Sequence, residues 1–334
     1  MRYLKLYKNH SEYEAEVTSG LTLPNVSHCI QEAEVHYNPI ETRVVTTYNV
    51  TSTSEPTPIG YNQFISAFTE IEIDGVVLPN VVSAYTFDTI GEHTVKYTLS
   101  DSTSIKTRSF SDCTSLTSIS IPNSITSIGN YVFDYCSGLT SITIPDSVTS
   151  IGKDAFNACR SLTSATIGSG VTSIGEYAFN TCFALSSVTI QGSITSISVG
   201  TFNYCSGLTE VTIPSSVTSI GQGAFNNCTK LSSIIIPDNV TSIGDSVFYA
   251  CHSLTSINIP SGTTTIGEFA FNGCSNLASI TSLATAAPTI QSNTFQNVKR
   301  NGTLTVPSGS SGYDVWMGTG NSYLGKYGWT KVEQ

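Results

Sequence analysis

The feature that most constrains this chain of 334 residues is a series of eight cysteines, each 23 residues after the last. They are Cys113, Cys136, Cys159, Cys182, Cys205, Cys228, Cys251 and Cys274. A phenylalanine stands three residues before each of them and a leucine three residues after. A fixed period of this length is typical of solenoids, in which each coil buries its apolar side against its neighbours. The cysteine spacing therefore predicts stacked coils over residues 104–293.

The repeating unit reads L-x-x-I-x-I-P-x-x-V-x-x-I-G-x-x-A-F-x-x-C-x-x, as in residues 139–161. Its L-x-x-I-x-I segment predicts a short strand in which Ile142 and Ile144 point inward while the intervening side chains point outward. Pro145 ends the strand because it has no backbone donor, and Gly152 permits the bend that follows. The Ala-Phe pair is expected to fill the centre of each coil.

A few coils depart from this unit. Gly168 and Gln191 replace the strand-ending proline, Ser198 replaces the bend glycine, and Thr263 replaces the valine. We therefore expect the middle coils to turn less tightly than the others.

The recurring L-x-x-I-x-I-P, V-x-x-I-G and A-F-x-x-C blocks resemble the BspA-like leucine-rich repeats, the Treponema-type class with units of 23 residues, over about residues 104–307. The resemblance implies a repeat solenoid, a right-handed β-solenoid with a parallel sheet on one face. It also implies adhesion at a cell surface or partner binding as the usual role, and no catalysis.

A solenoid exposes an apolar surface at each end, so both ends need covers. Residues 69–103 alternate as strands do around an Asp74-Gly75 turn, which predicts a small β module as the N-terminal cap. Residues 294–334 contain one last strand, Leu304 to Pro307, followed by an aromatic tail with both tryptophans, Trp316 and Trp329. We expect this tail to form the C-terminal cap.

The N-terminal part has a different texture. Residues 1–50 form an acidic leader, and TSTSEPTP opens a predicted linker over residues 51–68. The blocks PNVSHC (24–29) and EVHYNP (34–39) resemble leader segments of proteins encoded by gut Bacteroidales and their phages. That resemblance implies a tethering or assembly segment before a receptor-binding solenoid. The start, MRYLKLYKNHSEYE, lacks the apolar run of a secretory signal, which favours the assembly role.

Charge excludes some classes of partner. The chain has a net charge of −10, and residues 1–103 hold 13 acidic against 5 basic residues. Nucleic-acid binding needs clustered Lys and Arg, which this chain lacks, so no nucleic-acid partner is expected. No apolar run approaches the roughly 20 residues that cross a bilayer, so we expect no membrane span.

Stacked thiols point the same way, which is poor geometry for a disulfide or for tetrahedral zinc. We therefore predict eight buried, reduced cysteines that fill space in the core, and no metal site. Cys29 lies outside the series. A metal site formed by Cys29 with His10, His28 and His36 is the alternative that the sequence leaves open.

Catalytic motifs are absent from the sequence. The five histidines are dispersed, and no G-x-S-x-G, P-loop or H-E-x-x-H motif occurs. We predict no catalytic residue and no cofactor, and we place His252 in a solvent-facing loop. An asparagine follows the phenylalanine in five coils and is expected to bond turn backbone. These residues are Asn157, Asn180, Asn203, Asn226 and Asn272.

The first candidate binding surface is the outward side of the strands. Ser and Thr fill these positions in four coils, whereas Glu210, Ile235 and Asn258 interrupt the pattern in three consecutive coils. Functional residues of a solenoid usually lie on its surface, so this sheet face is where we expect a partner. Drift on an unused surface is the alternative.

The second candidate surface is the loop edge, which carries Tyr135, Phe183, Tyr204 and Tyr249. Exposed aromatic side chains are common anchors of interfaces. The alternative is that these rings cover neighbouring coils.

Together these observations predict a noncatalytic scaffold that binds a protein or glycan partner on a host or cell surface, and an extracellular or cell-surface location. The alternative is a structural component of a larger assembly, such as a phage virion appendage. In that case the leader would dock or form a homo-oligomer, and the solenoid would be displayed to the host.

Overall fold

The computed structural model describes residues 2–8, 11–17, 38–39, 43–291, 293–320 and 322–334. The chain divides into two compact units, residues 1–42 and residues 43–334. In the first unit, β1 (Arg2–Lys8), β2 (Ser11–Val17) and β3 (Asn38–Pro39) form an antiparallel sheet in the order β1-β2-β3. Cys29 and the three histidines considered with it lie outside the described residues.

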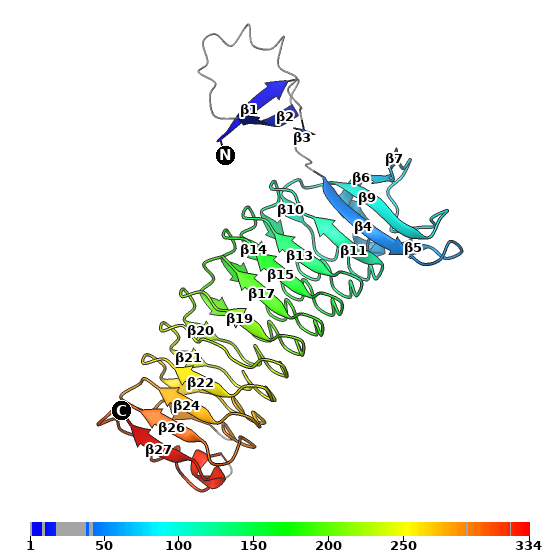
Figure 1. Cartoon of the computed structure of the whole chain (residues 1–334). Coiled ribbons are helices and arrows are strands. Elements are labelled where there is room, and N and C mark those ends of the chain that lie inside the picture. Colours follow the sequence, from blue (N-terminus) through cyan, green and yellow to red (C-terminus); the bar gives the residue numbers. More distant parts are fainter. Residues whose placement is uncertain (1, 9–10, 18–37, 40–42, 292, 321) are drawn as a thin grey trace, which may run out of the picture. The chain divides into compact units, whose positions relative to one another are not determined.

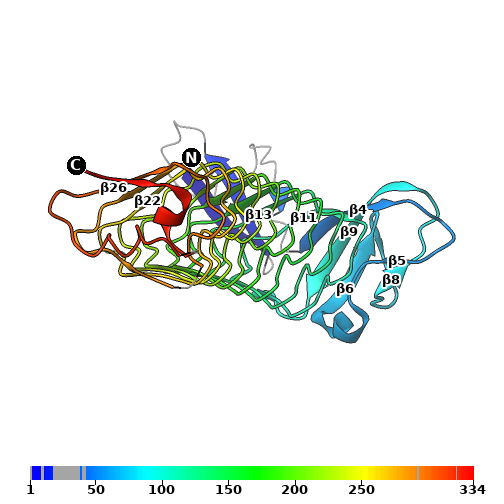
Figure 2. The ribbon, with the colours of Figure 1, turned by 90° about the horizontal axis from the view of Figure 1, so that it is seen from below.

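The second unit begins with a β module. Its elements are β4 (Val44–Val50), β5 (Thr57–Pro58), the 3-10 helix η1 (Asn62–Ala67), β6 (Phe68–Ile73), β7 (Val76–Val77), β8 (Ala84–Tyr85) and β9 (Gly91–Leu99). The hairpin between β6 and β7 turns at Asp74 and Gly75, both with positive φ, as the sequence predicts. The antiparallel sheet has the order β11-β4-β9-β6-β7, so its edge strand β11 comes from the solenoid (Figures 1 and 2).

Residues 43–50 fall in the acidic leader by sequence, but the structure places β4 inside this sheet. β4 pairs with β9 along its whole length and with β11 on its other side. Buried and more exposed side chains alternate along the seven residues of β4, which indicates a strand but not the strands with which it pairs. Those partners, β9 and β11, lie far along the chain. The range expected to be a linker likewise contains β5 and η1.

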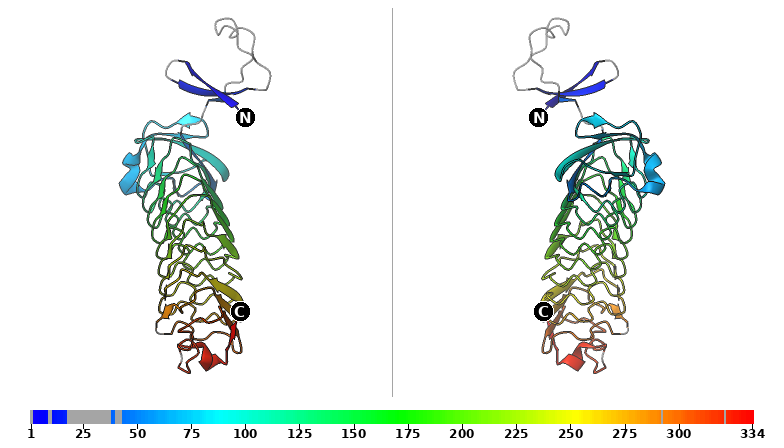
Figure 3. Two further views of the ribbon diagram at one scale, coloured as in Figure 1. Left: turned by 90° about the vertical axis from the view of Figure 1, so that its left-hand side faces the viewer. Right: turned by 90° about the vertical axis from the view of Figure 1, so that its right-hand side faces the viewer.

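The rest of the second unit is a parallel β-solenoid, as predicted, in which most coils add a strand to a main sheet and a two-residue strand to a back sheet (Figures 1 and 3). The main-sheet strands are β11 (Leu116–Ser120), β13 (Ser141–Ile144), β15 (Ser164–Ile167), β17 (Ser187–Ile190), β19 (Glu210–Thr212), β22 (Ser256–Ile259), β24 (Ser279–Ser282), β26 (Thr303–Val306) and β27 (Thr330–Glu333). The back-sheet strands are β10 (Ser104–Ile105), β12 (Ser127–Ile128), β14 (Ser150–Ile151), β16 (Ser173–Ile174), β18 (Ser196–Ile197), β20 (Ser219–Ile220), β21 (Ser242–Ile243), β23 (Thr265–Ile266) and β25 (Thr289–Ile290).

The register follows the repeat length. Ser141 lies beside Ser164 in the main sheet and Ile151 beside Ile174 in the back sheet, each pair 23 residues apart. Because identical positions of the repeat stack, each column of the sequence becomes a continuous row of side chains along the solenoid.

The interior is built on the phenylalanine column. Neighbouring rings from Phe110 to Phe295 stack with centroids 5.0 to 5.8 Å apart and planes within 17° of each other. Phe68 and Tyr97 of the β module contact Phe110 at one end, and Trp316 contacts Phe295 at the other. The aromatic column is therefore covered at both ends by side chains from outside the repeats.

The eight repeat cysteines are buried and free, which confirms the prediction made from their spacing. Each thiol from Cys136 to Cys274 also donates to the carbonyl oxygen of the phenylalanine 26 residues earlier, at 3.0 to 3.2 Å. Burial raises the pKa of Cys113 and of Cys251 to about 12. The thiols therefore link adjacent coils as well as filling space, a role that the sequence did not suggest.

The C-terminal residues add one more strand than the sequence indicates. β27 follows the 3-10 helix η2 (Leu324–Tyr327) and pairs in parallel with β26. The indole nitrogen of Trp316 donates to the Pro288 carbonyl at 3.0 Å, and that of Trp329 donates to the Lys299 carbonyl at 2.7 Å. These bonds satisfy the polar atoms of both tryptophans while their rings remain buried.

The back sheet is interrupted between β16 and β18. At the bend position, a Cβ on Gly175 would lie 2.5 Å from backbone atoms of the previous coil, so glycines permit this close stacking. Ser198 has a Cβ at the equivalent position and bonds to the Ile174 carbonyl through its side chain, at 2.5 Å. At Ser198 a side-chain bond thus stands where Gly175 and Gly221 donate their backbone N–H to the previous coil, and a looser turn there remains a prediction.

At Gly168 and Gln191 the prediction of looser coils is wrong. Both residues have the N–H that proline lacks, and they donate it to Ile144 and Ile167 of the preceding coils, at 3.0 and 2.9 Å. A Cβ on Gly168 would lie 2.7 Å from the Ile144 carbonyl oxygen. The coils therefore approach each other closely where the sequence suggested that they loosen.

Candidate binding surfaces

Alternation along the main-sheet strands determines which side chains reach solvent. In β13, Ile142 and Ile144 are buried, whereas Ser141 and Thr143 are exposed. The same pattern in β15, β17 and β22 produces two outward columns of small polar side chains. A partner that contacts this face meets mostly hydroxyl groups, except where the repeat changes.

All three residues predicted on this sheet face are exposed. Glu210 lies beside Ser187 in the first outward column, and Asn258 lies beside Thr281 in the second. Ile235 stands between them along the solenoid and is 82% exposed. Their exposure fits a contact surface, and their role in binding remains a prediction.

The main sheet is interrupted at Ile235. Residues 231–237 form no strand, so β19 and β22 belong to separate sheets. Ile234 and Ile236 are nevertheless buried on either side of it. The inward contacts of this coil are therefore kept although its strand pairing is lost.

The four residues predicted on the loop edge are also exposed, by 38% to 49%. Tyr135 and Tyr204 directly precede repeat cysteines and have φ of 58° and 57°, a backbone conformation that bulky side chains adopt at a cost. The ring of Phe183 lies 5.8 Å from the guanidinium carbon of Arg160. Their position on the surface agrees with the prediction, and no contact described here assigns them a partner.

The predicted asparagine ladder exists but has different partners. Asn157 donates to the Asp134 carboxylate, Asn180 to Asn157, and Asn203 to Asn180, each at 2.8 Å. These bonds join side chain to side chain along the stack and not to turn backbone, because residues 23 positions apart lie next to each other. Burial raises the pKa of Asp134 at the start of the ladder.

Titratable groups are sparse in the described part of the chain. His252 is exposed, as predicted, and its Nδ1 lies 2.9 Å from the Gly273 carbonyl oxygen. His93 in the β module is paired with Asp74 at 2.6 Å. Among the described residues, no group of three or more His, Cys, Asp or Glu side chains could hold a metal ion. None of the described helices is long and apolar enough to cross a membrane.

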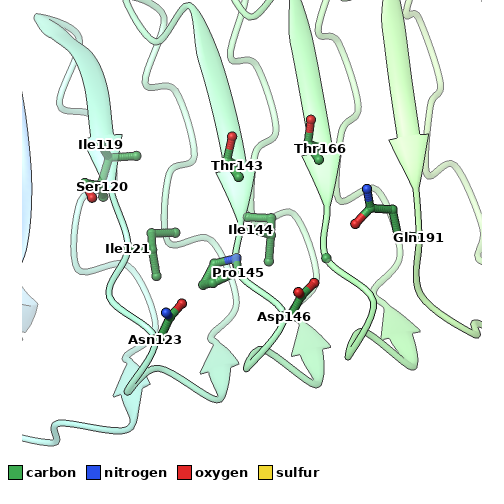
Figure 4. Close-up of a pocket in the computed structure, with 11 residues that line it drawn as sticks. Ile119, Ser120, Ile121, Asn123, Thr143, Ile144, Pro145, Asp146, Thr166 and Gln191 are labelled. Atoms are coloured by element: carbon green, nitrogen blue, oxygen red, sulfur yellow. The ribbon is translucent and has the colours of Figure 1, made fainter. Parts of the chain in front are cut away.

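A hollow that the sequence analysis did not identify lies on the main sheet, across the ends of β11, β13 and β15 and reaching Gln191 after β17 (Figure 4). It has a volume of about 480 Å³ and is lined by residues of four consecutive coils. The lining side chains include Asn123, Asp146 and Gln191. Gln191 is one of the two replacements of the strand-ending proline, which was the available signal in the sequence.

The geometry defines a capped parallel β-solenoid with a buried leucine at the same position of each coil. The family model for the BspA type leucine rich repeat region matches residues 80–209 and 195–313, with six copies of the repeat. The chain belongs to this family. Its repeats typically form noncatalytic scaffolds, and comparison with curated proteins found no match.

Solved structures of bacterial leucine-rich repeat proteins are similar. One from Bacteroides ovatus is 27% identical, with a TM-score of 0.56 over 69% of this chain and 60% of that one. A leucine rich cell surface protein of Faecalibacterium prausnitzii is 29% identical, with a TM-score of 0.42 over 57% and 60%. A leucine rich repeat protein of T. pallidum is 28% identical, with a TM-score of 0.42 over 47% and 72%. The chain thus spans 60% of the length of the B. ovatus protein.

Proposed function

We propose that this protein is a noncatalytic adhesion scaffold that binds a protein partner at a cell surface through its main sheet. Membership of a repeat family typical of surface and adhesion proteins supports the class of function. The contact surface is centred on Glu210, Ile235 and Asn258.

The exposed Ile235 is the observation that carries this proposal. A solvated isoleucine on a face of hydroxyl groups contributes nothing to the core, since 82% of it is exposed. Burial of such a side chain by a partner yields about 1.5–3 kcal/mol. Glu210 and Asn258 supply a charge and an amide on either side, so the surface combines an apolar centre with polar neighbours, as interfaces do.

The proposal is tested by restoring the repeat pattern at these three positions. The triple variant Glu210→Ser, Ile235→Thr, Asn258→Thr has the residues that most other coils carry there, so its fold is expected to be intact. Binding of beads coated with the full-length protein to an epithelial cell layer should fall at least about tenfold, in the range of a lost interface hot spot.

The loop edge supplies the matched comparison. Tyr135→Asn with Tyr204→Asn removes two exposed rings and leaves a residue that tolerates positive φ. This variant should bind the cells as the wild type does. Loss of adhesion in the loop-edge variant but not in the triple variant would move the site to the loop edge, and unchanged adhesion in both would reject both surfaces.

An assembly role is a second proposal, and the separate N-terminal unit favours it. Residues 1–42 cluster apart from residues 43–334, as expected of a docking segment that carries a displayed solenoid. Sedimentation of the full chain tests the self-association form of this proposal. A concentration-independent monomer would contradict a homo-oligomer built through this unit.

A further inference from the structure

We propose that the hollow across the ends of β11, β13 and β15 binds a neutral oligosaccharide. This inference rests on the proposed noncatalytic binding function, and it adds a second site and a ligand class. The lining of the hollow ends at Gln191, two coils before Ile235, and it contains none of Glu210, Ile235 and Asn258.

On one side the hollow is bounded by β11, which also belongs to the sheet of the β module. β11 pairs antiparallel with β4, whereas β13 begins the parallel ladder of the solenoid. The Thr140 amide still donates to the Thr117 carbonyl at 3.2 Å, but β11 and β13 belong to different sheets. Past that bond the hollow is lined by Ile119, which is partly exposed, and by the edges of Ile121 and Ile144, whose side chains are buried.

Two departures from the repeat line this region. Proline rings follow the strands at Pro145 and Pro214, but Gly168 and Gln191 stand at the equivalent positions of the two coils between them. Gly168 has no side chain, and Gln191 replaces a rigid ring with a flexible amide. Figure 4 shows the Gln191 amide on the side of the hollow away from β11.

Three polar side chains surround the hollow with unused hydrogen-bonding capacity. Asp146 Oδ1 accepts from the Ser169 amide at 2.7 Å, which leaves Oδ2 available. The side-chain amides of Asn123 and Gln191 form no hydrogen bond within the described part of the chain. Hydroxyl groups of Ser120, Thr143 and Thr166 complete the lining.

This set matches the chemistry of a sugar. Amides and hydroxyls both donate and accept, as sugar hydroxyls do, and a carboxylate accepts from two neighbouring hydroxyls. The partly exposed Ile119 provides an apolar contact for the C–H face of a sugar ring. No Lys, Arg or His lines the hollow, and its one charge is the Asp146 carboxylate, so an anionic ligand is disfavoured.

The dimensions favour a short oligosaccharide over a peptide strand. Four stacked coils span roughly 14 Å at the usual strand spacing, and the volume of about 480 Å³ falls within the range of small-ligand sites. An extra peptide strand between β11 and β13 would require them to lie about 10 Å apart. The bond between Thr140 and Thr117 holds the strands closer than that at one end of the hollow.

The test is a glycan array probed with the labelled full-length protein, carrying neutral and anionic oligosaccharides. We expect binding to neutral glycans and at least tenfold weaker binding to sialylated or sulfated ones. In the Asn123→Ala, Gln191→Ala variant, affinity for the bound glycan should fall at least tenfold with unchanged Tm. Gln222→Ala, on the back-sheet side, is the matched control and should bind as the wild type does.

Asp146→Asn separates charge from shape, since the amide oxygen can still accept from Ser169. This variant should keep binding neutral glycans and lose its discrimination against anionic ones. Binding of anionic glycans alone, no binding to any neutral glycan, or an Asn123→Ala, Gln191→Ala variant with full affinity would each overturn the proposal. A peptide that binds wild type and loses affinity in that double variant would overturn the ligand class.

The two proposals fail in different ways. The Glu210, Ile235 and Asn258 triple variant should retain glycan binding, because its substitutions lie outside the hollow. If the triple variant loses cell adhesion while the wild type binds no neutral glycan, the adhesion proposal stands and the glycan site is rejected. If neutral glycans bind at the hollow while the triple variant adheres to cells as the wild type does, the glycan site stands and the adhesion surface is rejected.

Discussion

The two sheets of the solenoid are interrupted at different places, and the interior between them is continuous at both. Within the parallel ladders, the back sheet is broken between β16 and β18, where Ser198 replaces glycine, and the main sheet is broken at residues 231–237. Phe179 and Phe202 stack across the first break at 5.7 Å, and Phe225 and Phe248 stack beside the second at 5.8 Å. The phenylalanine column therefore survives where the hydrogen-bonded ladders do not.

The difference follows from the energies involved. A backbone hydrogen bond contributes about 0.5–1.5 kcal/mol net, because the unfolded chain bonds to water instead. Removal of a buried phenylalanine costs about 3–5 kcal/mol. A solenoid can thus lose a short stretch of hydrogen-bonded ladder at one coil at little cost. The loss of one interior ring would destabilise that coil and the coils packed against it.

The largest expected effect is that of Phe202→Ala. Phe202 is buried between Phe179 and Phe225, so its removal should lower the free energy of unfolding by about 3–5 kcal/mol. Urea denaturation measures the change. The control Tyr204→Asn removes an exposed ring from the same coil and should change stability by less than about 0.5 kcal/mol. Similar losses for both variants would contradict the comparison.

Gly175→Ala should have the next largest effect. The added methyl group would lie 2.5 Å from backbone of the previous coil, so the coils must separate, at a cost of about 1–3 kcal/mol. Gly262→Ala is the matched control, because its methyl group would meet only the Asp238 oxygen, at 3.6 Å. If urea denaturation shows equal stability for the two variants, close glycine stacking does not explain the break at Ser198.

A smaller effect concerns the β module, whose His93 should make the thermal stability of the protein depend on pH. Burial of the His93 ring lowers its pKa, but hydrogen bonds to Asp74 and Thr89 outweigh this, so the pKa lies above its ordinary value. This pairing stabilises the fold fully below pH 6.5, the ordinary pKa, and the contribution is lost as pH rises through the raised pKa. Thermal unfolding between pH 6 and 8 should show a falling Tm. Asp74→Asn, which keeps the oxygen that bonds Thr94, should flatten this dependence.

The smallest expected effect on stability is that of Ile235→Thr. The side chain is 82% exposed, so the free energy of unfolding should change by less than about 0.5 kcal/mol. Amide hydrogen exchange at residues 232–236 should remain faster than at 141–144 in both proteins. Protection that rises in the variant to the level of β13 would show that Ile235 itself opens the main sheet.

The interior was predictable from the sequence because its positions are set by local alternation and by the period. Phe156, Cys159 and Leu162 each occur at a fixed offset, and each is buried as expected. The partners of polar side chains were less predictable. The asparagine ladder runs to Asp134 and not to turn backbone, because the choice depends on which side chains come within reach once the coils stack.

The exposed positions were also predictable, including Glu210 and Ile235, since alternation indicates which residues face outward. The hollow was not. Gly168 and Gln191 were recognised as departures, but the hollow that they line is bounded on its other side by β11, which leaves the parallel ladder to pair with β4. No pattern within either strand contains that pairing.

The repeat pattern alone establishes that this protein is a solenoid with phenylalanine, cysteine and leucine columns inside and hydroxyl-rich columns outside. It does so because every coil buries one face of a short strand in the same way, so the same residue types recur at the same positions. The tertiary structure alone decided where the two sheets break and where a hollow opens. Those features depend on contacts between coils and between β11 and the β module, which are set by close backbone approach and strand direction.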